Sequence, residues 1–177
     1  MPKTQRYNPF VCAKELLERL AVKSLPTPVE RIAKSLEAQV RFAAFDDELS
    51  GMIYIKEGVP IIGINSLHHP NRQRFTLAHE LGHLELHRDM ITSSVHVDKN
   101  FPALMRDTRS AAGTEQIEIE ANQFAAELLM PRALIEEVLA GKQFDIDDDG
   151  PIEELAKKFR VSRQALEYRI RDRGWGV

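Results

Sequence analysis

Residues 72–87 have the sequence RQRFTLAHELGHLELH, and this stretch decides both the fold class and the chemistry that the chain can support. Apolar residues recur in it at helical spacing, which predicts a helix over residues 71–88. Within that helix His79 and His83 lie four residues apart, so they share one face about one turn apart. Their imidazoles can therefore bind a single metal ion, as in an HExxH motif.

Glu80 directly follows the first of these histidines. Zinc lowers the pKa of a water molecule bound to it toward about 7. A carboxylate beside that water can accept its proton and pass it to a leaving amine. The motif therefore predicts that Glu80 is the catalytic base of a metal-dependent hydrolase.

A catalytic zinc ion usually has three protein ligands and one open position. His87 continues the four-residue spacing, but it cannot share an ion with His79 on a straight helix. The helix rises about 12 Å between them, whereas two zinc–nitrogen bonds span at most about 4 Å. We expect His87 to lie at the surface or to contact a ligand residue.

The third ligand is expected from the segment EIEANQFAAELLMP (118–131), which predicts a helix with an apolar stripe centred on Ala121. Glu118 lies roughly 60° from the centre of this stripe and Glu120 roughly 100° from it. This favours Glu118 as the third ligand and leaves Glu120 as the alternative. Asn122, one turn after Glu118, is placed to brace a metal-bound imidazole.

The rest of the chain predicts an α+β fold in which helices precede and follow a run of strands. Alternating residues between Val40 and Ile64 indicate about three strands, which we expect to form an antiparallel sheet packed on the HExxH helix. Thr27 and Glu30 have the spacing of a capping box at the start of an early helix. Outside the strands we expect further helices at 10–23, 28–36, 114–130 and 132–140. We expect a long loop at 91–113.

The C-terminal segment, residues 151–177, resembles a helix-turn-helix with seven basic and four acidic residues. Arg160 occupies the turn position where glycine is favoured, and it would be strained at a positive φ. We favour a helical hairpin packed on the main domain over DNA or partner binding. The predicted organisation is a domain at 1–142, an acidic linker at 143–150 and this hairpin.

Composition narrows the class of protein further. A net charge of −3 gives no strong attraction to nucleic acid or anionic membranes. One cysteine, Cys12, excludes a disulfide framework. Neither a signal peptide nor a membrane span is evident, so we expect a cytoplasmic protein. Tyr54 and His96 are candidate oxyanion stabilisers, although an ordinary strand tyrosine and loop histidine are the favoured interpretation.

The two segments together, RQRFTLAHELGHLELH and EIEANQFAAELLMP, strongly resemble the ImmA/IrrE family of metallopeptidases. The resemblance covers roughly residues 25–140. It implies a small zincin-like α+β domain in which His79, His83 and Glu118 bind the metal and Glu80 is the catalytic base. Zinc is the implied ion, with manganese or another divalent ion as the alternative.

The resemblance also implies a function, which composition and spacing do not provide. It implies a metallo-endopeptidase that cleaves a helix-turn-helix repressor of the XRE type, encoded nearby, and so regulates transcription of a mobile element, phage or stress regulon. The alternative is a metal-stabilised regulatory or toxin–antitoxin-type partner that binds a repressor or DNA without cutting it. The presence of Glu80 favours the enzyme.

Overall fold

The computed structural model describes residues 8–93, 96–99, 108–140 and 149–171. Side chains are described for fewer residues within these ranges, and those of 108–114 are among the ones left out. The helices are α1 (Pro9–Arg19), α2 (Val29–Ser35), α3 (Pro70–Leu86), α4 (Arg88–Ser93), α5 (Thr108–Leu129), α6 (Arg132–Leu139), α7 (Asp149–Phe159) and α8 (Arg163–Arg171). The strands are β1 (Gln39–Ala43), β2 (Leu49–Lys56), β3 (Val59–Asn65) and β4 (His96–Lys99).

The described part of the chain has an α+β fold, as predicted, but its sheet is mixed and not antiparallel. The strand order is β1-β3-β2-β4. Strand β3 pairs antiparallel with β2 and parallel with β1, and β4 pairs antiparallel with β2. The prediction of an antiparallel sheet was wrong because β3 lies between β1 and β2, and alternation along a strand carries no information about which strands become neighbours.

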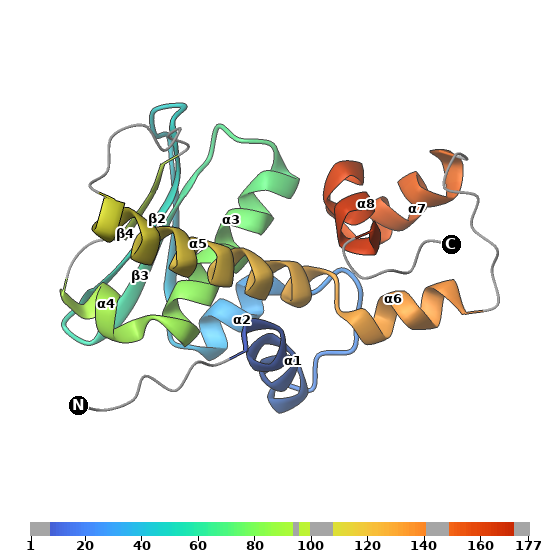
Figure 1. Cartoon of the computed structure of the whole chain (residues 1–177), viewed down its shortest axis with the longest axis horizontal. Helices are drawn as coiled ribbons and strands as arrows, with labels where there is room; N and C mark the ends of the chain where they lie inside the picture. Colours follow the sequence, from blue (N-terminus) through green and yellow to red (C-terminus); the bar gives the residue numbers. More distant parts are fainter. Residues whose placement is uncertain (1–7, 94–95, 100–107, 141–148, 172–177) are drawn as a thin grey trace.

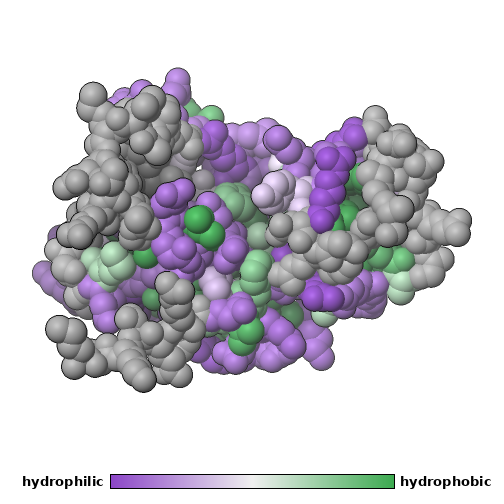
Figure 2. Space-filling model, viewed as in Figure 1, coloured by the Kyte–Doolittle hydropathy of each residue, from purple (hydrophilic) through white to green (hydrophobic). Residues whose placement is uncertain are grey.

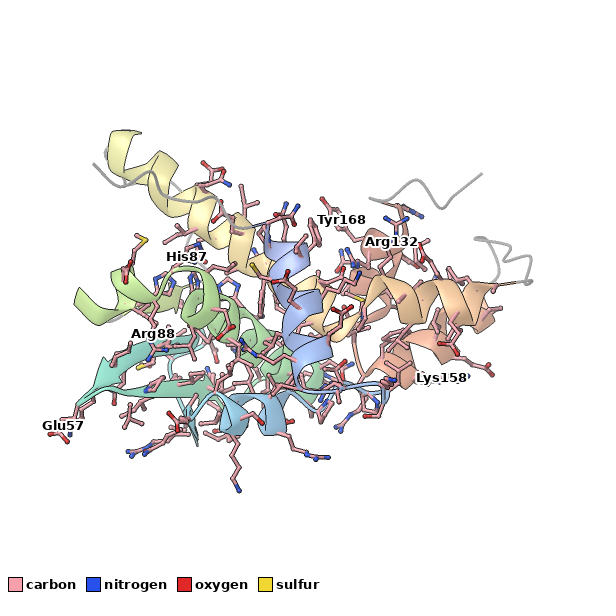
Figure 3. The ribbon with its side chains drawn as sticks, turned by 90° about the horizontal axis from the view of Figure 1, so that it is seen from below. Glu57, His87, Arg88, Arg132, Lys158 and Tyr168 are labelled. Atoms are coloured by element: carbon pink, nitrogen blue, oxygen red, sulfur yellow. The ribbon has the colours of Figure 1, made fainter. Side chains whose placement is uncertain are left out.

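Helix α3 lies between the sheet and α5, and this layering is visible from below in Figure 3. The sheet faces α3 with fully buried isoleucines, which include Ile53 on β2 and Ile62 and Ile64 on β3. On the other side of α3, Leu128 and Phe124 of α5 are also fully buried. Helix α3 is therefore enclosed from two sides, which explains why its whole middle section is withdrawn from solvent.

In the segment expected as a loop, 91–113, the described residues instead form the end of α4, strand β4 and the start of α5, while 94–95 and 100–107 lie outside the described residues. Strand β4 is four residues long, which is too short to show a hydrophobic period. The predicted capping box is also absent, since α2 begins after Pro28 without a side-chain cap. The Thr27 side chain is instead fully buried.

The C-terminal helices α7 and α8 lie at the end of the molecule away from the sheet (Figure 1). Between them Arg160 has φ of +53°, the left-handed conformation considered from the sequence. A buried ion pair joins Arg169 of α8 to Glu127 of α5, and Arg169 also donates to the Met130 carbonyl at 3.3 Å. Its guanidinium lies 5.4 Å from the ring centre of Phe10 in α1.

On the face shown in Figure 2, hydrophobic residues form small groups among hydrophilic ones. No described helix combines the length and the apolar character that crossing a membrane requires.

Candidate metal centre and active site

Helix α3 carries the HExxH residues in its second half. The helix begins at Pro70, a favourable first residue because proline lacks the N–H that would be left unpaired there. The His69 side chain caps it by accepting a hydrogen bond from the backbone N–H of Asn71 at 3.2 Å. His79, Glu80 and His83 are each at most 3% exposed. Such burial requires polar partners for all three side chains.

Close packing between α3 and α5 brings the later helix to these residues. Gly82 makes this possible, because a Cβ there would lie 3.1 Å from both the Cα and the carbonyl oxygen of Ala121. The absence of a side chain on one helix and a single methyl group on the other let the two backbones approach closely. Glu118, three residues before Ala121, is thereby carried to the histidines.

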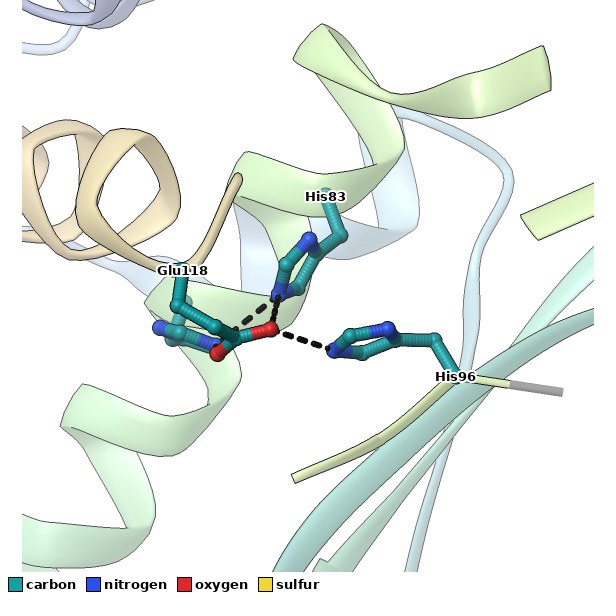
Figure 4. Close-up of side chains that lie close together, drawn as sticks. His83, His96 and Glu118 are labelled. Atoms are coloured by element: carbon teal, nitrogen blue, oxygen red, sulfur yellow. Dashed lines mark hydrogen bonds and ion pairs between the residues drawn. The ribbon is translucent and has the colours of Figure 1, made fainter. Parts of the chain in front are cut away.

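Four donor side chains meet at one point (Figure 4). The Nε2 atoms of His79 and His83 are 2.9 Å apart. Glu118 places its Oε2 atom 3.2 Å from His79 Nε2 and its Oε1 atom 3.5 Å from His83 Nε2. The fourth member is His96 of β4, whose Nε2 atom is 3.0 Å from Glu118 Oε1. All four ligand atoms lie within 4.8 Å of one another.

The protonation states in this cluster suit a divalent cation. Burial, opposed by a hydrogen bond with Glu118, lowers the pKa of His83 to about 4, so its imidazole is neutral near pH 7. Burial alone would raise the pKa of Glu118, but hydrogen bonds with His79, His83 and His96 outweigh it and hold this pKa far below its usual range. Neutral imidazole and ionised carboxylate are the forms that bind metal ions.

The side chain of Glu80, a residue of α3, packs against Gly51 of strand β2. A Cβ at Gly51 would come within 3.0 Å of Glu80 Oε1 and 2.5 Å of Thr76 Cγ2. Glycine at this position therefore makes room for the carboxylate beside the strand. Glu80 is fully buried, and it immediately follows His79 in the chain.

The structure brings together the residues proposed from the sequence as metal ligands, namely His79, His83 and Glu118. Asn122, proposed to brace a metal-bound imidazole, has its Oδ1 atom 2.9 Å from His79 Nδ1. Glu120, the alternative ligand, is not in the cluster and instead contacts His87 at 3.0 Å.

Sequence reasoning did not identify His96 as a member of the cluster. It lies opposite Ile53 in the pairing of β4 with β2, and this pairing turns its side chain toward α3. A signal for this position would have required recognising β4 as a strand. Within the described residues, no hydrogen bond or ion pair links Tyr54 to the cluster.

A helix with two histidines one turn apart, a glutamate after the first and a carboxylate from a second helix defines the class of HExxH metalloproteins. The chain belongs to the peptidase M78 family, whose IrrE N-terminal-like domain matches residues 33–171. The resemblance to the ImmA/IrrE metallopeptidases is therefore confirmed.

Two curated relatives are named radiation response metalloprotease IrrE. The protein from Deinococcus radiodurans is 38% identical over 116 residues, which cover 62% of this chain and 30% of that protein. The protein from Deinococcus deserti is 38% identical over 119 residues, which cover 64% of this chain and 36% of that protein. The matched region therefore spans about a third of the length of these two relatives.

A third relative is closer in length. The uncharacterized immunity region protein 2 of Bacillus phage phi105 is 26% identical over 141 residues, which cover 80% of this chain and 82% of that protein. Among solved structures, a Mycobacterium tuberculosis transcriptional regulator matches 92% of this chain and 46% of its own, with a TM-score of 0.62 and 17% identity. This structural likeness shows a shared fold.

Proposed function

We propose that this protein is a zinc-dependent endopeptidase in which His79, His83 and Glu118 hold the ion and Glu80 is the catalytic base. The observation that carries the proposal is the convergence of these three donors beside a fully buried Glu80, in a chain of a metallopeptidase family. Two imidazoles and one carboxylate form a ligand set found in catalytic zinc sites. Manganese or another divalent ion remains the alternative occupant.

A divalent ion in this site would polarise the substrate carbonyl and acidify a water molecule. The chain's own residues supply the rest. Glu80 accepts the proton of the attacking water and returns it to the leaving amine, and its burial keeps bulk water from competing for that proton. We assign His96, whose Nε2 atom lies 3.0 Å from Glu118 Oε1, to hydrogen bonding with the substrate carbonyl oxygen as negative charge develops there, because the other three members of the cluster suffice to hold the ion.

We propose a helix-turn-helix repressor of the XRE type, encoded near this gene, as the substrate. Two observations support a regulatory substrate of this kind: the relative in a phage immunity region and the two radiation response metalloproteases. A repressor substrate implies that the reaction takes place in the cytoplasm. The alternative, a partner that binds without cutting, is disfavoured because it gives Glu80 no chemical role.

We also propose that residues 1–142 form a zincin-like catalytic domain and residues 151–177 a helix-turn-helix-like hairpin that packs against it. The ion pair between Arg169 and Glu127 supports this packing. The same contact favours a structural role for the hairpin over DNA binding. Residues 141–148, which include most of the proposed acidic linker, lie outside the described residues.

The decisive experiment separates metal binding from catalysis. Untagged protein is analysed for zinc, and it is then incubated with the neighbouring repressor while mass spectrometry locates any cut. Glu80→Gln keeps the shape of the side chain but cannot accept a proton. It should retain zinc and lose cleavage at least 10²–10⁴-fold, the usual contribution of a general base.

Glu85→Gln is the matched control, since it changes a glutamate of the same helix that pairs with Arg19 near the surface. It should leave both zinc content and cleavage unchanged. Wild-type protein that binds no zinc or manganese would refute the metal site. A Glu80→Gln variant that cuts at the wild-type rate would remove Glu80 from the mechanism.

A further inference from the structure

A chain of polar contacts runs from His83 in the metal centre through His87 to Glu120 on α5. His87 follows the last residue of α3, and its backbone N–H donates to the His83 carbonyl at 2.9 Å, which ends the helix. Its side chain turns back, so that its Nδ1 atom lies 3.2 Å from His83 Nδ1. The other ring nitrogen, Nε2, lies 3.0 Å from Glu120 Oε2. Figure 3 labels His87 where the end of α3 approaches α5.

The contacts fit one arrangement of donors and acceptors that leaves the metal-facing nitrogen of His83 free to bind an ion. In this arrangement the Glu120 carboxylate accepts a hydrogen bond from His87 Nε2, and His87 Nδ1 is the acceptor on the other side of the ring. A metal ion on His83 Nε2 would take the lone pair of that nitrogen and replace its contact with Glu118. The proton of His83 would then be on Nδ1, which would donate to His87 Nδ1.

Glu120 is itself held in place by its other oxygen. Gln116, one turn earlier on α5, donates its side-chain amide to Glu120 Oε1 at 2.8 Å. His87 is 8% exposed, and the Glu120 side chain is 22% exposed. The carboxylate therefore has a defined orientation at the edge of the protein interior and does not swing freely in solvent.

We propose that His87 and Glu120 are positioning residues for the metal site, which together fix the tautomer and the ring plane of His83. This inference rests on the proposed function, because it assigns His83 to the metal. The same task at the other histidine falls to Asn122, which contacts His79 Nδ1 directly. At His83 the supporting contact comes from His87, which is in turn held by Glu120. We call these two residues the His87–Glu120 brace.

A purely structural role is the competing explanation, in which the contact only joins the end of α3 to α5. The two explanations differ in what they predict for metal affinity. Loss of a group that orients a metal-binding histidine typically weakens metal binding 10–100-fold. Loss of a contact between two helices lowers the stability of the metal-free protein but leaves the affinity of the folded protein unchanged.

The test measures the zinc dissociation constant of the full chain by competition with a chromophoric chelator. His87→Phe keeps a ring of similar shape but cannot accept from His83, and Glu120→Met removes the carboxylate. Each variant should bind zinc 10–100-fold more weakly than the wild type. The double variant should be no weaker than His87→Phe alone, because Glu120 acts only through His87.

Two further variants complete the design. His87→Gln retains a side-chain oxygen that can accept from His83, and it should recover part of the affinity lost in His87→Phe. Glu115→Met is the matched control, since it changes an exposed glutamate of the same helix. It should bind zinc as the wild type does.

The outcomes separate this proposal from the one on which it rests. If the wild type binds zinc and both single variants bind it within threefold of the wild type, the brace is refuted and the metal site stands. If the wild type itself binds no zinc, both proposals fall. Circular dichroism verifies the fold of each variant, and if His87→Phe does not fold, the Glu120→Met measurement decides.

Discussion

Replacing Arg169 with methionine tests whether the C-terminal hairpin is part of the same folding unit as the metal centre. Arg169 is 3% exposed and Glu127 5% exposed, so the ion pair between α8 and α5 is buried. Methionine fills a similar volume but leaves the Glu127 carboxylate and the Met130 carbonyl without this donor. Removing one partner of a buried ion pair typically costs about 3–5 kcal/mol. In a protein of this size, such a loss lowers Tm by about 6–20 °C.

Differential scanning calorimetry of the metal-free protein provides the assay. Arg171→Met is the control, because Arg171 lies on the same helix and is exposed, and it should shift Tm by no more than about 2 °C. A second variant, Glu127→Gln, should lower Tm in the same direction as Arg169→Met. The reasoning is refuted if Arg169→Met melts like its control, or if the wild type shows two separate transitions of which only one responds.

Three further predictions concern packing, pH and backbone strain. In Gly82→Ala the new methyl group meets the backbone of Ala121 at 3.1 Å, and overpacking of about 1–3 kcal/mol is offset by about 1 kcal/mol of helix propensity. The free energy of unfolding should therefore fall little. Zinc affinity should fall, because the displaced α5 carries Glu118. Unchanged affinity in a chelator competition would contradict this expectation. The metal-free protein should lose stability as pH falls from 6.5 toward 4, because the unfolded chain binds a proton there that buried His83 rejects. The loss of stability approaches about 3 kcal/mol. The lowered pKa of Glu118 makes the loss continue below pH 4.5. Urea unfolding at pH 7 and pH 4 measures the loss, and equal stability at both pH values would argue against a buried neutral His83. Arg160 has a positive φ, and Arg160→Gly relieves about 1–2 kcal/mol of strain against about 0.5–1 kcal/mol for the greater chain entropy of glycine. The net gain of about 0.5–1 kcal/mol should raise Tm by about 1–4 °C, and a lower Tm would show that the arginine side chain compensates for the strain.

Local patterns in the sequence were sufficient to predict the helix that carries the HExxH residues. Spacing of three and four residues fixes which side chains share a face, and that rule holds wherever the helix lies in the fold. The same rule placed Glu118 at the edge of the buried stripe, and the structure brings it to His79 and His83. Each of these inferences involved residues within about three turns of one helix.

The features that were missed depend on contacts between distant parts of the chain. The parallel pairing of β1 with β3 follows from strand order, which no period within β1 reveals. His96 enters the cluster only because β4 pairs with β2. Thr27 had the residue type and spacing of a helix cap, but tertiary packing buries its side chain and the box does not form.

Helix α5 has a consequence for how sequences of this kind can vary in length. Near its middle, Glu118 lies in the metal-site cluster, Glu120 contacts His87 and Asn122 contacts His79. Further along the helix, Glu127 pairs with Arg169 of α8. Inserting or deleting one residue between positions 118 and 127 would rotate one group of side chains about 100° against the other and shift it about 1.5 Å. The number of residues between positions 118 and 127 is therefore constrained by the contacts at both ends of this segment. Changes in chain length are expected to accumulate in the connections outside it, and a relative with a gap inside it would have to rebuild either the metal centre or the hairpin contact.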